Sequence, residues 1–317
     1  MSAKRENMGG NSIQGEVFFQ DHKERLSRFD ETAWLVRAAG KINLTLSVGP
    51  KRSDGYHDFE SLMATITLYD DILLRMGPDS INLTCNDPSL PAGSDNLVYR
   101  ACSLLSSQSD TDADVDIELV KRIPTQAGLG GGSADAAATL LGLNELWKLN
   151  WPTEELSKLA AMLGSDVGFF LAGPLAVCTG RGEIVKPLDF VWNFWVVVIK
   201  PKIALSTAEV YKHYVRKDNA TFARADSLVK LLPKSKPSQI YSYLENDLET
   251  PAFRITGELG SLRKNLQKLL NVPVRLSGSG SAMFAIFDDR EQAQSALHRI
   301  QSSYTELTCW LGKNNVW

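Results

Sequence analysis

Apolar and polar residues alternate over two long stretches near the start of the chain, and this spacing predicts strands. Residues 34–48 and 59–76 alternate as half-buried strands do, with a turn expected at Gly40 and a break expected near Asp70 and Asp71. Further strands are predicted at residues 80–85, 115–120, 169–184, 194–201, 273–288 (with a turn inside), and 306–311.

Helical spacing separates these strands. Asn96 is an N-cap candidate before an apolar pattern of helical period, and Pro152 precedes two acidic residues that suit a first helical turn. Helices are predicted at residues 97–107, 133–147, 152 onward, 207–214, 225–232, 237–247, 256–270 and 291–301. Strands and helices do not alternate as regular βαβ units, so we expect an α+β fold.

Charge and composition narrow the class of protein. The chain has 317 residues and a formal net charge of −3, which gives no electrostatic reason to expect a nucleic acid partner. The four cysteines form no CxxC pair, and no HExxH motif is present. No apolar run reaches the roughly 20 residues that span a bilayer, and the first thirty residues are polar. We expect a cytoplasmic enzyme without a membrane partner.

A glycine run between a predicted strand and a predicted helix is the strongest chemical signal. Four glycines lie within five positions, ahead of Ser133 and an alanine-rich helix. Glycine lets the backbone approach a ligand, and a helix start offers free N–H groups, so this arrangement suits phosphates. A P-loop would need a lysine where Ser133 stands, and a dinucleotide fold would need an acidic residue ~20 positions later at a strand end. The alternative is a linker or a closely packed helix start.

A second glycine turn, at residues 276–282, lies between two apolar strands. Glycine–serine turns are common in hairpins, so an ordinary turn is one interpretation. Packing against a phosphate loop is the other, because the residues are small.

Three motifs in order carry a resemblance to a known family. Lys41-Ile42-Asn43-Leu44, the run from Pro124 to Ala134, and Ser277-Gly278-Ser279-Gly280 together resemble the GHMP kinases. The resemblance implies two α+β domains with the active site in the cleft between them. The polar start of the chain predicts an extension at 1–33, and the resemblance implies an ATP-binding domain at 34–188 and a C-terminal domain at 189–317, with ATP as co-substrate and Mg²⁺ expected with it.

The same resemblance implies the catalytic residues. Asp166, in the segment from Gly164 to Phe170, is the implied general base for an alcohol acceptor, and Lys41 would keep it ionised and stabilise charge on the alcohol oxygen. The alternatives are a loop aspartate bound by backbone N–H groups and a surface lysine at a strand turn. Lys41, however, lies in a small and apolar stretch.

The acceptor is implied by residues 54–57, Asp-Gly-Tyr-His, which resemble the branch of the family that phosphorylates the 2-hydroxyl of a cytidine diphosphate-linked methylerythritol. An aromatic ring can stack on a base, and a histidine can meet its polar edge. The implied substrate-binding residues are Asn43, Tyr56, His57, Thr207, Tyr211, Gly278, Ser279 and Gly280. Core packing remains an alternative for Tyr211, and an exposed strand position for Asn43.

The implied ATP-binding residues are Asn96, Lys121, Pro124, Thr125, Gln126, Ala127, Gly128, Leu129, Gly130, Gly131, Gly132, Ser133 and Ala134. The chain departs from the family pattern at three places. Gln126 stands where glycine or alanine is common, Gly168 where proline is frequent, and Asp135 where asparagine is frequent. These departures bear on loop rigidity or nucleotide affinity.

Two other hypotheses stay open. One is a GHMP kinase for homoserine or a mevalonate derivative. Such a substrate carries no base for Tyr56 and Tyr211 to bind. The other is a non-catalytic binding protein, for which keeping both Lys41 and Asp166 has no purpose. Whether the chain is a monomer or a homodimer is left open by the sequence.

Overall fold

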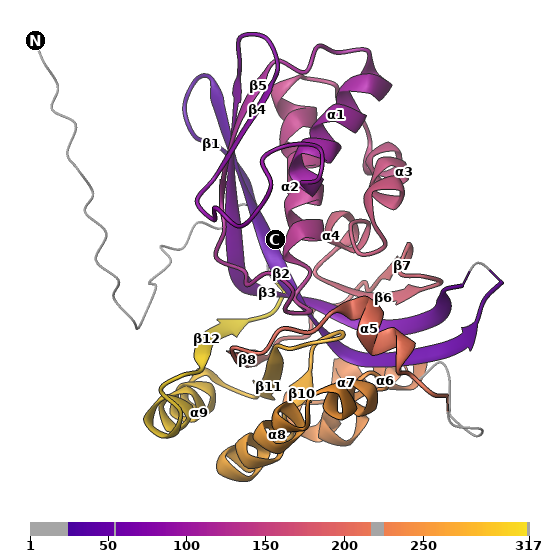
Figure 1. The fold of residues 1–317 in the computed structure, drawn as a ribbon, viewed down its shortest axis with the longest axis vertical. Helices are drawn as coiled ribbons and strands as arrows, with labels where there is room; N and C mark the ends of the chain where they lie inside the picture. The colour runs from indigo at the N-terminus through magenta and orange to yellow at the C-terminus, as the bar shows by residue number, and fades with distance from the viewer. Residues whose placement is uncertain (1–24, 54, 217–224, 316–317) are drawn as a thin grey trace, which may run out of the picture.

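The computed structural model describes residues 25–53, 55–216 and 225–315. They form two sheets with helices packed on both (Figure 1). The first sheet runs in the order β1-β2-β3-β5-β4, with β6, β7 and β9 attached, and the second in the order β10-β11-β8-β12. The predicted α+β fold is confirmed.

Two long antiparallel strands, β2 (Ala33–Lys51) and β3 (His57–Met76), form the spine of the first sheet (Figure 1). The turn predicted at Gly40 and the break predicted near Asp70 are both wrong. The chain stays extended through Gly40, where the register shifts as in a β-bulge. Asp70 is fully buried inside β3 because its carboxylate accepts hydrogen bonds from the backbone N–H groups of Arg122 and Ile123.

The other strands of this sheet are short. They are β1 (Leu26–Arg28), β4 (Ile81–Cys85), β5 (Val115–Val120), β6 (Leu175–Thr179) and β7 (Ile184–Pro187). β1 lies within the segment expected to be a polar extension and pairs with β2. The strand predicted from residue 169 is wrong at its start, where Phe169–Ala172 forms the short helix α4.

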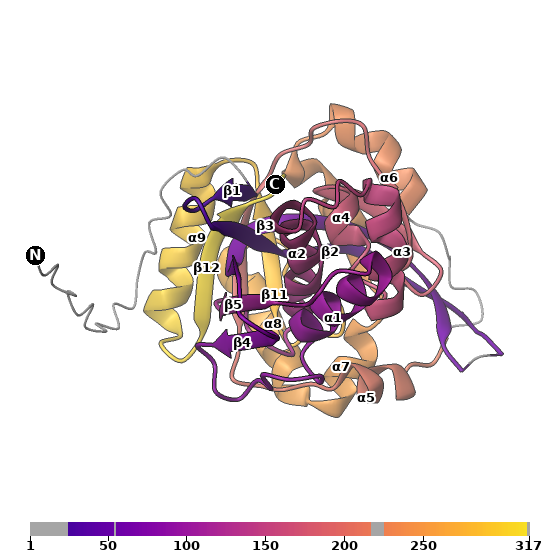
Figure 2. The ribbon, with the colours of Figure 1, turned by 90° about the horizontal axis from the view of Figure 1, so that it is seen from above.

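Helices cover one face of the first sheet. α1 (Leu97–Ser109), α2 (Gly131–Leu146) and α3 (Thr153–Leu163) lie together with α4 on that face (Figures 1 and 2). The alanines of α2 are buried, which lets the helix lie close to β2 and β3. Asn96 caps α1, as predicted, by accepting a hydrogen bond from the Val98 N–H at 2.9 Å.

The second half of the chain forms the smaller sheet and its helices. Its strands are β8 (Trp195–Lys200), β10 (Arg275–Leu276), β11 (Met283–Phe287) and β12 (Thr308–Lys313). Its helices are α5 (Thr207–Lys212), α6 (Ala225–Leu231), α7 (Glu249–Ile255), α8 (Gly257–Leu270), α9 (Arg290–Ser303) and the 3₁₀ segments Leu232–Lys234 and Pro237–Tyr243.

The helix predicted over residues 237–247 is wrong in its last part. Glu245–Asn246 is strand β9, which pairs in parallel with β2 and so adds a C-terminal segment to the first sheet. Ile42 and Leu44 of β2 belong to a core shared with Val196 and Phe284 of the second sheet. The intervening residues of β2, Lys41 and Asn43, therefore point the other way, toward a cavity.

Candidate active site

A cavity of about 460 Å³ lies where the glycine run, β2 and the C-terminal half meet. Most residues that the sequence singled out line it: Lys41, Asn43, Asn96, Lys121, Pro124, Thr125, Gln126, Ala127, Gly128, Leu129, Gly130, Gly131, Gly132, Ser133, Asp166, Thr207, Tyr211, Gly278 and Ser279. Tyr56, His57, Ala134 and Gly280 are not among its lining residues. Segments far apart in sequence thus form one site.

The glycine run is shaped by close backbone contacts. Gly128 has a φ of +76°, and a Cβ there would lie 2.0 Å from the carbonyl oxygen of Ser277. Gly130, at φ +71°, precedes α2, whose first N–H groups begin at the cavity. Gln126 has a φ of +51°, a region that favours glycine, and this is a physical reason why glycine suits that position.

The second glycine turn packs against the first. The Ser277 hydroxyl donates a hydrogen bond to the Gly128 carbonyl at 2.9 Å, and the Ala282 N–H donates one to the Ala127 carbonyl at 3.1 Å. The hydroxyls of Ser279 and Thr207 lie 2.8 Å apart. The second interpretation of this turn, packing against a phosphate loop, therefore describes its contacts.

Lys41, Asn43 and Asp166 form a polar group beside the glycine run. The Lys41 ammonium donates to Asn43 Oδ1 at 2.6 Å and lies 3.6 Å from Asp166 Oδ2. The Lys41 N–H also donates to the Leu129 carbonyl at 2.8 Å, which ties β2 to the loop. The Lys41 side chain is 5% exposed and that of Asp166, in the turn between α3 and α4, is 31% exposed. The Asp166 carboxylate is therefore near a cation and open to a ligand.

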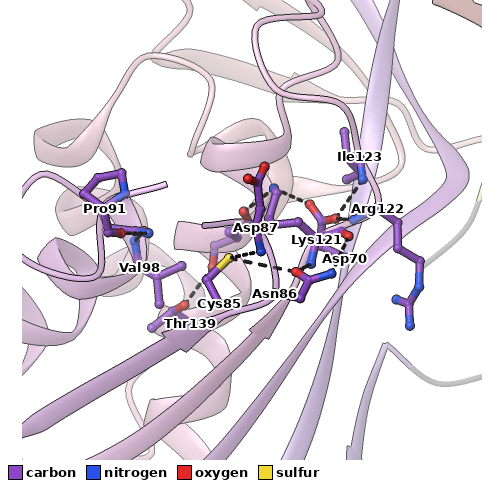
Figure 3. A network of polar contacts seen from close by, with 12 residues as sticks. Asp70, Cys85, Asn86, Asp87, Pro91, Val98, Lys121, Arg122, Ile123 and Thr139 are labelled. Atoms are coloured by element: carbon purple, nitrogen blue, oxygen red, sulfur yellow. Dashed lines mark hydrogen bonds and ion pairs between the residues drawn. The ribbon is translucent and has the colours of Figure 1, made fainter. Parts of the chain in front are cut away.

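A second lysine in the cavity, Lys121, has tighter partners. Its ammonium lies 2.5 Å from Asp70 Oδ2 and 2.6 Å from Asp135 Oδ2. Figure 3 shows Asp70 between Lys121 and the backbone of Arg122 and Ile123, with dashed lines joining them. Lys121 thus holds together β3, the end of β5 and the N-terminal part of α2.

Burial shifts the pKa values of this group. Burial and the nearby charge of Asp70 raise the pKa of Asp135 well above its usual range. Burial lowers the pKa of Lys121, but the charges of Asp135 and Asp70 outweigh burial and raise it overall. The lysine therefore stays charged, and Asp135 takes up a proton at a higher pH than an ordinary aspartate does.

Aromatic rings extend from the cavity toward the end of the β2–β3 hairpin. Tyr211 lines the cavity, and its ring centroid lies 6.0 Å from that of His57, which in turn lies 5.9 Å from that of Tyr214. Burial, and then the charge of Asp166, raise the pKa of Tyr211. Tyr56 precedes His57 in the chain and is 60% exposed. Asp54 lies outside the described residues.

The sequence missed several residues of the site. Asp70 and Asp135 were not recognised as partners of Lys121, because they lie 51 and 14 positions away from it. A charged residue inside an apolar strand was the available signal for Asp70. The apolar part of the lining was also missed: Leu46, Met63, Leu90, Pro91, Leu97, Leu119 and Leu248.

Two negative findings concern the described residues. Across residues 25–53, 55–216 and 225–315, no three His, Cys, Asp or Glu side chains gather as a metal site would need. Over the same ranges, no helix combines the length and the apolarity needed to cross a membrane.

Family models match both halves of the chain. The GHMP kinases N terminal domain matches residues 96–174, and the GHMP kinases C terminal domain matches residues 228–306. The first match contains the glycine run and Asp166, and the second contains the second glycine turn.

Curated relatives match most of the chain. A 4-diphosphocytidyl-2-C-methyl-D-erythritol kinase of Shouchella clausii is 39% identical over 273 residues, which cover 86% of this chain and 92% of the relative. The enzyme of the same name from Syntrophomonas wolfei is 36% identical, with 86% and 96% covered.

Solved structures agree in fold. A 4-(cytidine 5'-diphospho)-2C-methyl-D-erythritol kinase has a TM-score of 0.76 and 34% identity, with 89% of this chain and all of that chain covered. A homoserine kinase from Cytophaga hutchinsonii has a TM-score of 0.71 over 95% of this chain and 98% of its own, at 18% identity, a likeness of fold alone.

Proposed function

The chain belongs to the 4-diphosphocytidyl-2-C-methyl-D-erythritol kinase family of the GHMP kinases, and we propose that it carries out that reaction. ATP transfers its γ-phosphoryl group to the 2-hydroxyl of the methylerythritol unit and leaves as ADP. The product is the 2-phosphate, in the non-mevalonate route to isoprenoid precursors. The observation that carries the proposal is the Lys41–Asp166 pair at the glycine run, 3.6 Å apart and open to the cavity.

In the proposed mechanism Asp166 accepts the proton of the acceptor hydroxyl as the alcohol oxygen attacks the γ-phosphorus. The bond from that phosphorus to the β,γ-bridging oxygen breaks, and ADP takes the electron pair. Lys41 lies beside the Asp166 carboxylate and stabilises the charge that develops on the oxygens. Asn43 fixes the Lys41 ammonium by accepting its hydrogen bond, and is itself fixed by donating to Ser61 Oγ at 2.7 Å.

The proposed donor site is the glycine run with the start of α2. Backbone N–H groups and the positive end of the helix suit the phosphates of ATP. Mg²⁺ prefers oxygen ligands and is commonly held by one or two carboxylates together with substrate phosphates. The Ser133 hydroxyl lines the cavity at the start of α2 and would supply one oxygen ligand beside the phosphates, so that the ion would neutralise phosphate charge when bound.

The proposed acceptor site lies on the opposite side of the pair. Thr207, Ser279 and Tyr211 line the cavity there, and His57 follows Tyr211 outward. In this arrangement the methylerythritol unit lies near Asp166 and the cytosine reaches the rings of the hairpin end. Asn96 and Lys121 lie at the nucleotide end, where Lys121 acts through its fixed position between two carboxylates.

The test is ADP release by the purified chain with Mg-ATP and 4-diphosphocytidyl-2-C-methyl-D-erythritol, with homoserine and mevalonate as comparison acceptors. We expect turnover with the cytidyl acceptor and at least a hundredfold lower kcat/KM with the others, since both lack a base, and base stacking contributes about 1–3 kcal/mol before diphosphate contacts are added. Turnover with homoserine or mevalonate alone would refute the proposal and support the alternative GHMP kinase.

A further inference from the structure

The turn between β6 and β7 touches both the catalytic segment and the end of the β2–β3 hairpin. The Gly180 carbonyl accepts a hydrogen bond from the Phe59 N–H at 2.8 Å, next to Tyr56 and His57 in the chain. A Cβ on Gly182 would lie 3.2 Å from the Phe59 ring and 3.2 Å from Ser165, the neighbour of Asp166. This turn is therefore the contact between the two ends of the acceptor site.

Arg181 stands at the tip of that turn, and its own backbone is fixed. Its N–H donates to Glu183 Oε2 at 2.6 Å, and its Nε lies 3.8 Å from Glu183 Oε1. The glycines on either side, Gly180 and Gly182, have φ values of +73° and +122°, which a residue with a side chain rarely adopts. The turn thus holds the backbone of Arg181, and Glu183 lies beside its guanidinium.

The Arg181 guanidinium carbon lies 5.6 Å from the centroid of the Tyr56 ring. This distance is within the range of a cation–π contact, which at an exposed site contributes about 0.5–1 kcal/mol. Tyr56 is 60% exposed, so a base can still reach its ring. A ring that contacts a guanidinium loses less freedom when a base stacks on it than a ring without such a contact.

We propose that Arg181 is a positioning residue for the acceptor, which orients Tyr56 so that its ring receives the cytosine base. This inference rests on the proposed function, because it assigns a base to the ring. Arg181 acts through Tyr56 and touches neither ATP nor the reacting oxygens. Its removal therefore weakens binding of the acceptor and leaves the chemical step unchanged.

The test compares KM for the cytidyl acceptor, KM for ATP and kcat in five variants. Arg181→Ala raises the acceptor KM about two- to fivefold, the equivalent of one exposed cation–π contact, and leaves kcat and the ATP KM unchanged. Arg181→Lys keeps a cation and restores part of the affinity. Lys186 is an exposed lysine on β7. Lys186→Ala removes one positive charge, as Arg181→Ala does, but does not remove the Arg181 contact with the Tyr56 ring, and it has no effect on the three constants.

The fourth and fifth variants are Tyr56→Ala and the double mutant Tyr56→Ala/Arg181→Ala. If Arg181 acts through Tyr56, the acceptor KM of the double mutant equals that of Tyr56→Ala alone, which a direct contact between Arg181 and the diphosphate would not produce. The inference would be overturned if the rises in acceptor KM of the two single variants multiplied in the double mutant. It would also be overturned if Arg181→Ala left the acceptor KM unchanged, or raised the ATP KM by the same factor.

A measurement without substrate separates this inference from the proposed function. Amide hydrogen exchange over residues 55–59 becomes faster in Arg181→Ala and stays unchanged in Lys186→Ala. Failure of the wild type to phosphorylate the cytidyl acceptor refutes the function. Unchanged exchange in Arg181→Ala refutes the positioning role.

Discussion

Two lysines line the same cavity, and they differ in how their carboxylate partners hold them. Lys41 lies 3.6 Å from one carboxylate, Asp166, whose side chain is 31% exposed. Lys121 lies 2.5 and 2.6 Å from two carboxylates, Asp70 and Asp135, whose side chains are 0% and 4% exposed. A loose pair leaves its carboxylate able to accept a proton from a ligand, whereas a locked pair only maintains the shape of the site. The comparison separates a reactive region from a supporting one.

The largest effect should come from the carboxylate of the loose pair. Asp166→Asn keeps the shape of the side chain but removes the proposed base, and kcat should fall by ~2 to 4 orders of magnitude. ADP release under saturating substrates measures it, and an unchanged melting temperature is the control for folding. Turnover like that of the wild type would remove Asp166 from the mechanism.

The locked lysine should matter next, through stability. Lys121→Met leaves two buried carboxylates without their cation, and the free energy of unfolding should fall by about 3–5 kcal/mol. Urea unfolding followed by circular dichroism measures it. A loss below 1 kcal/mol in the free energy of unfolding would show that the two buried carboxylates do not depend on Lys121.

Lys41→Met is the matched change in the loose pair. It should lower kcat by about 10²–10³-fold, as removal of one charge-stabilising donor does. Its free energy of unfolding should fall less than that of Lys121→Met, because the exposed Asp166 can be solvated. If the two lysine variants lose equal stability and equal turnover, the distinction between the regions fails.

The smallest effect concerns protonation in the locked group. The raised pKa of Asp135 means that the folded chain holds this proton at a pH where the unfolded chain, with the ordinary pKa of 3.8, has released it. Protons are then lost on unfolding, so this residue makes the free energy of unfolding decrease as pH rises above that value.

The asparagine in Asp135→Asn cannot ionise, so residue 135 no longer makes the free energy of unfolding decrease as pH rises. The stability of the variant relative to the wild type should rise with pH by at most about 1.4 kcal/mol per unit. Urea unfolding at several pH values between 4 and 8 measures the slope. A relative stability that falls with pH would contradict the direction.

The sequence predicted the reactive region better than the supporting one. Lys41 and Asn43 could be placed on one face of β2 because strand residues two positions apart share a face. The glycine run could be placed at the start of α2 because its neighbours predict a strand and a helix. The structure has both features, which depend only on residues close together in the sequence.

Contacts over long sequence separation could not be predicted in the same way. Asp70 was interpreted as a strand break, because a charged residue interrupts an apolar pattern, and its partners appear only when β3, β5 and α2 are packed together. The same holds for β9, which is too short to show a period and is a strand only through its pairing with β2. The position of Tyr56 outside the cavity also depends on the path of the hairpin rather than on its sequence.

The hydrogen bond from Ser277 to Gly128 has a consequence for biosynthesis. The two residues are 149 positions apart, so the glycine run leaves the ribosome long before the residues that hold it. The strand β9, which borders β2, is also synthesised late. A nascent or truncated chain that ends before these residues lacks both contacts, so the glycine run takes its final shape only after most of the polypeptide has been made.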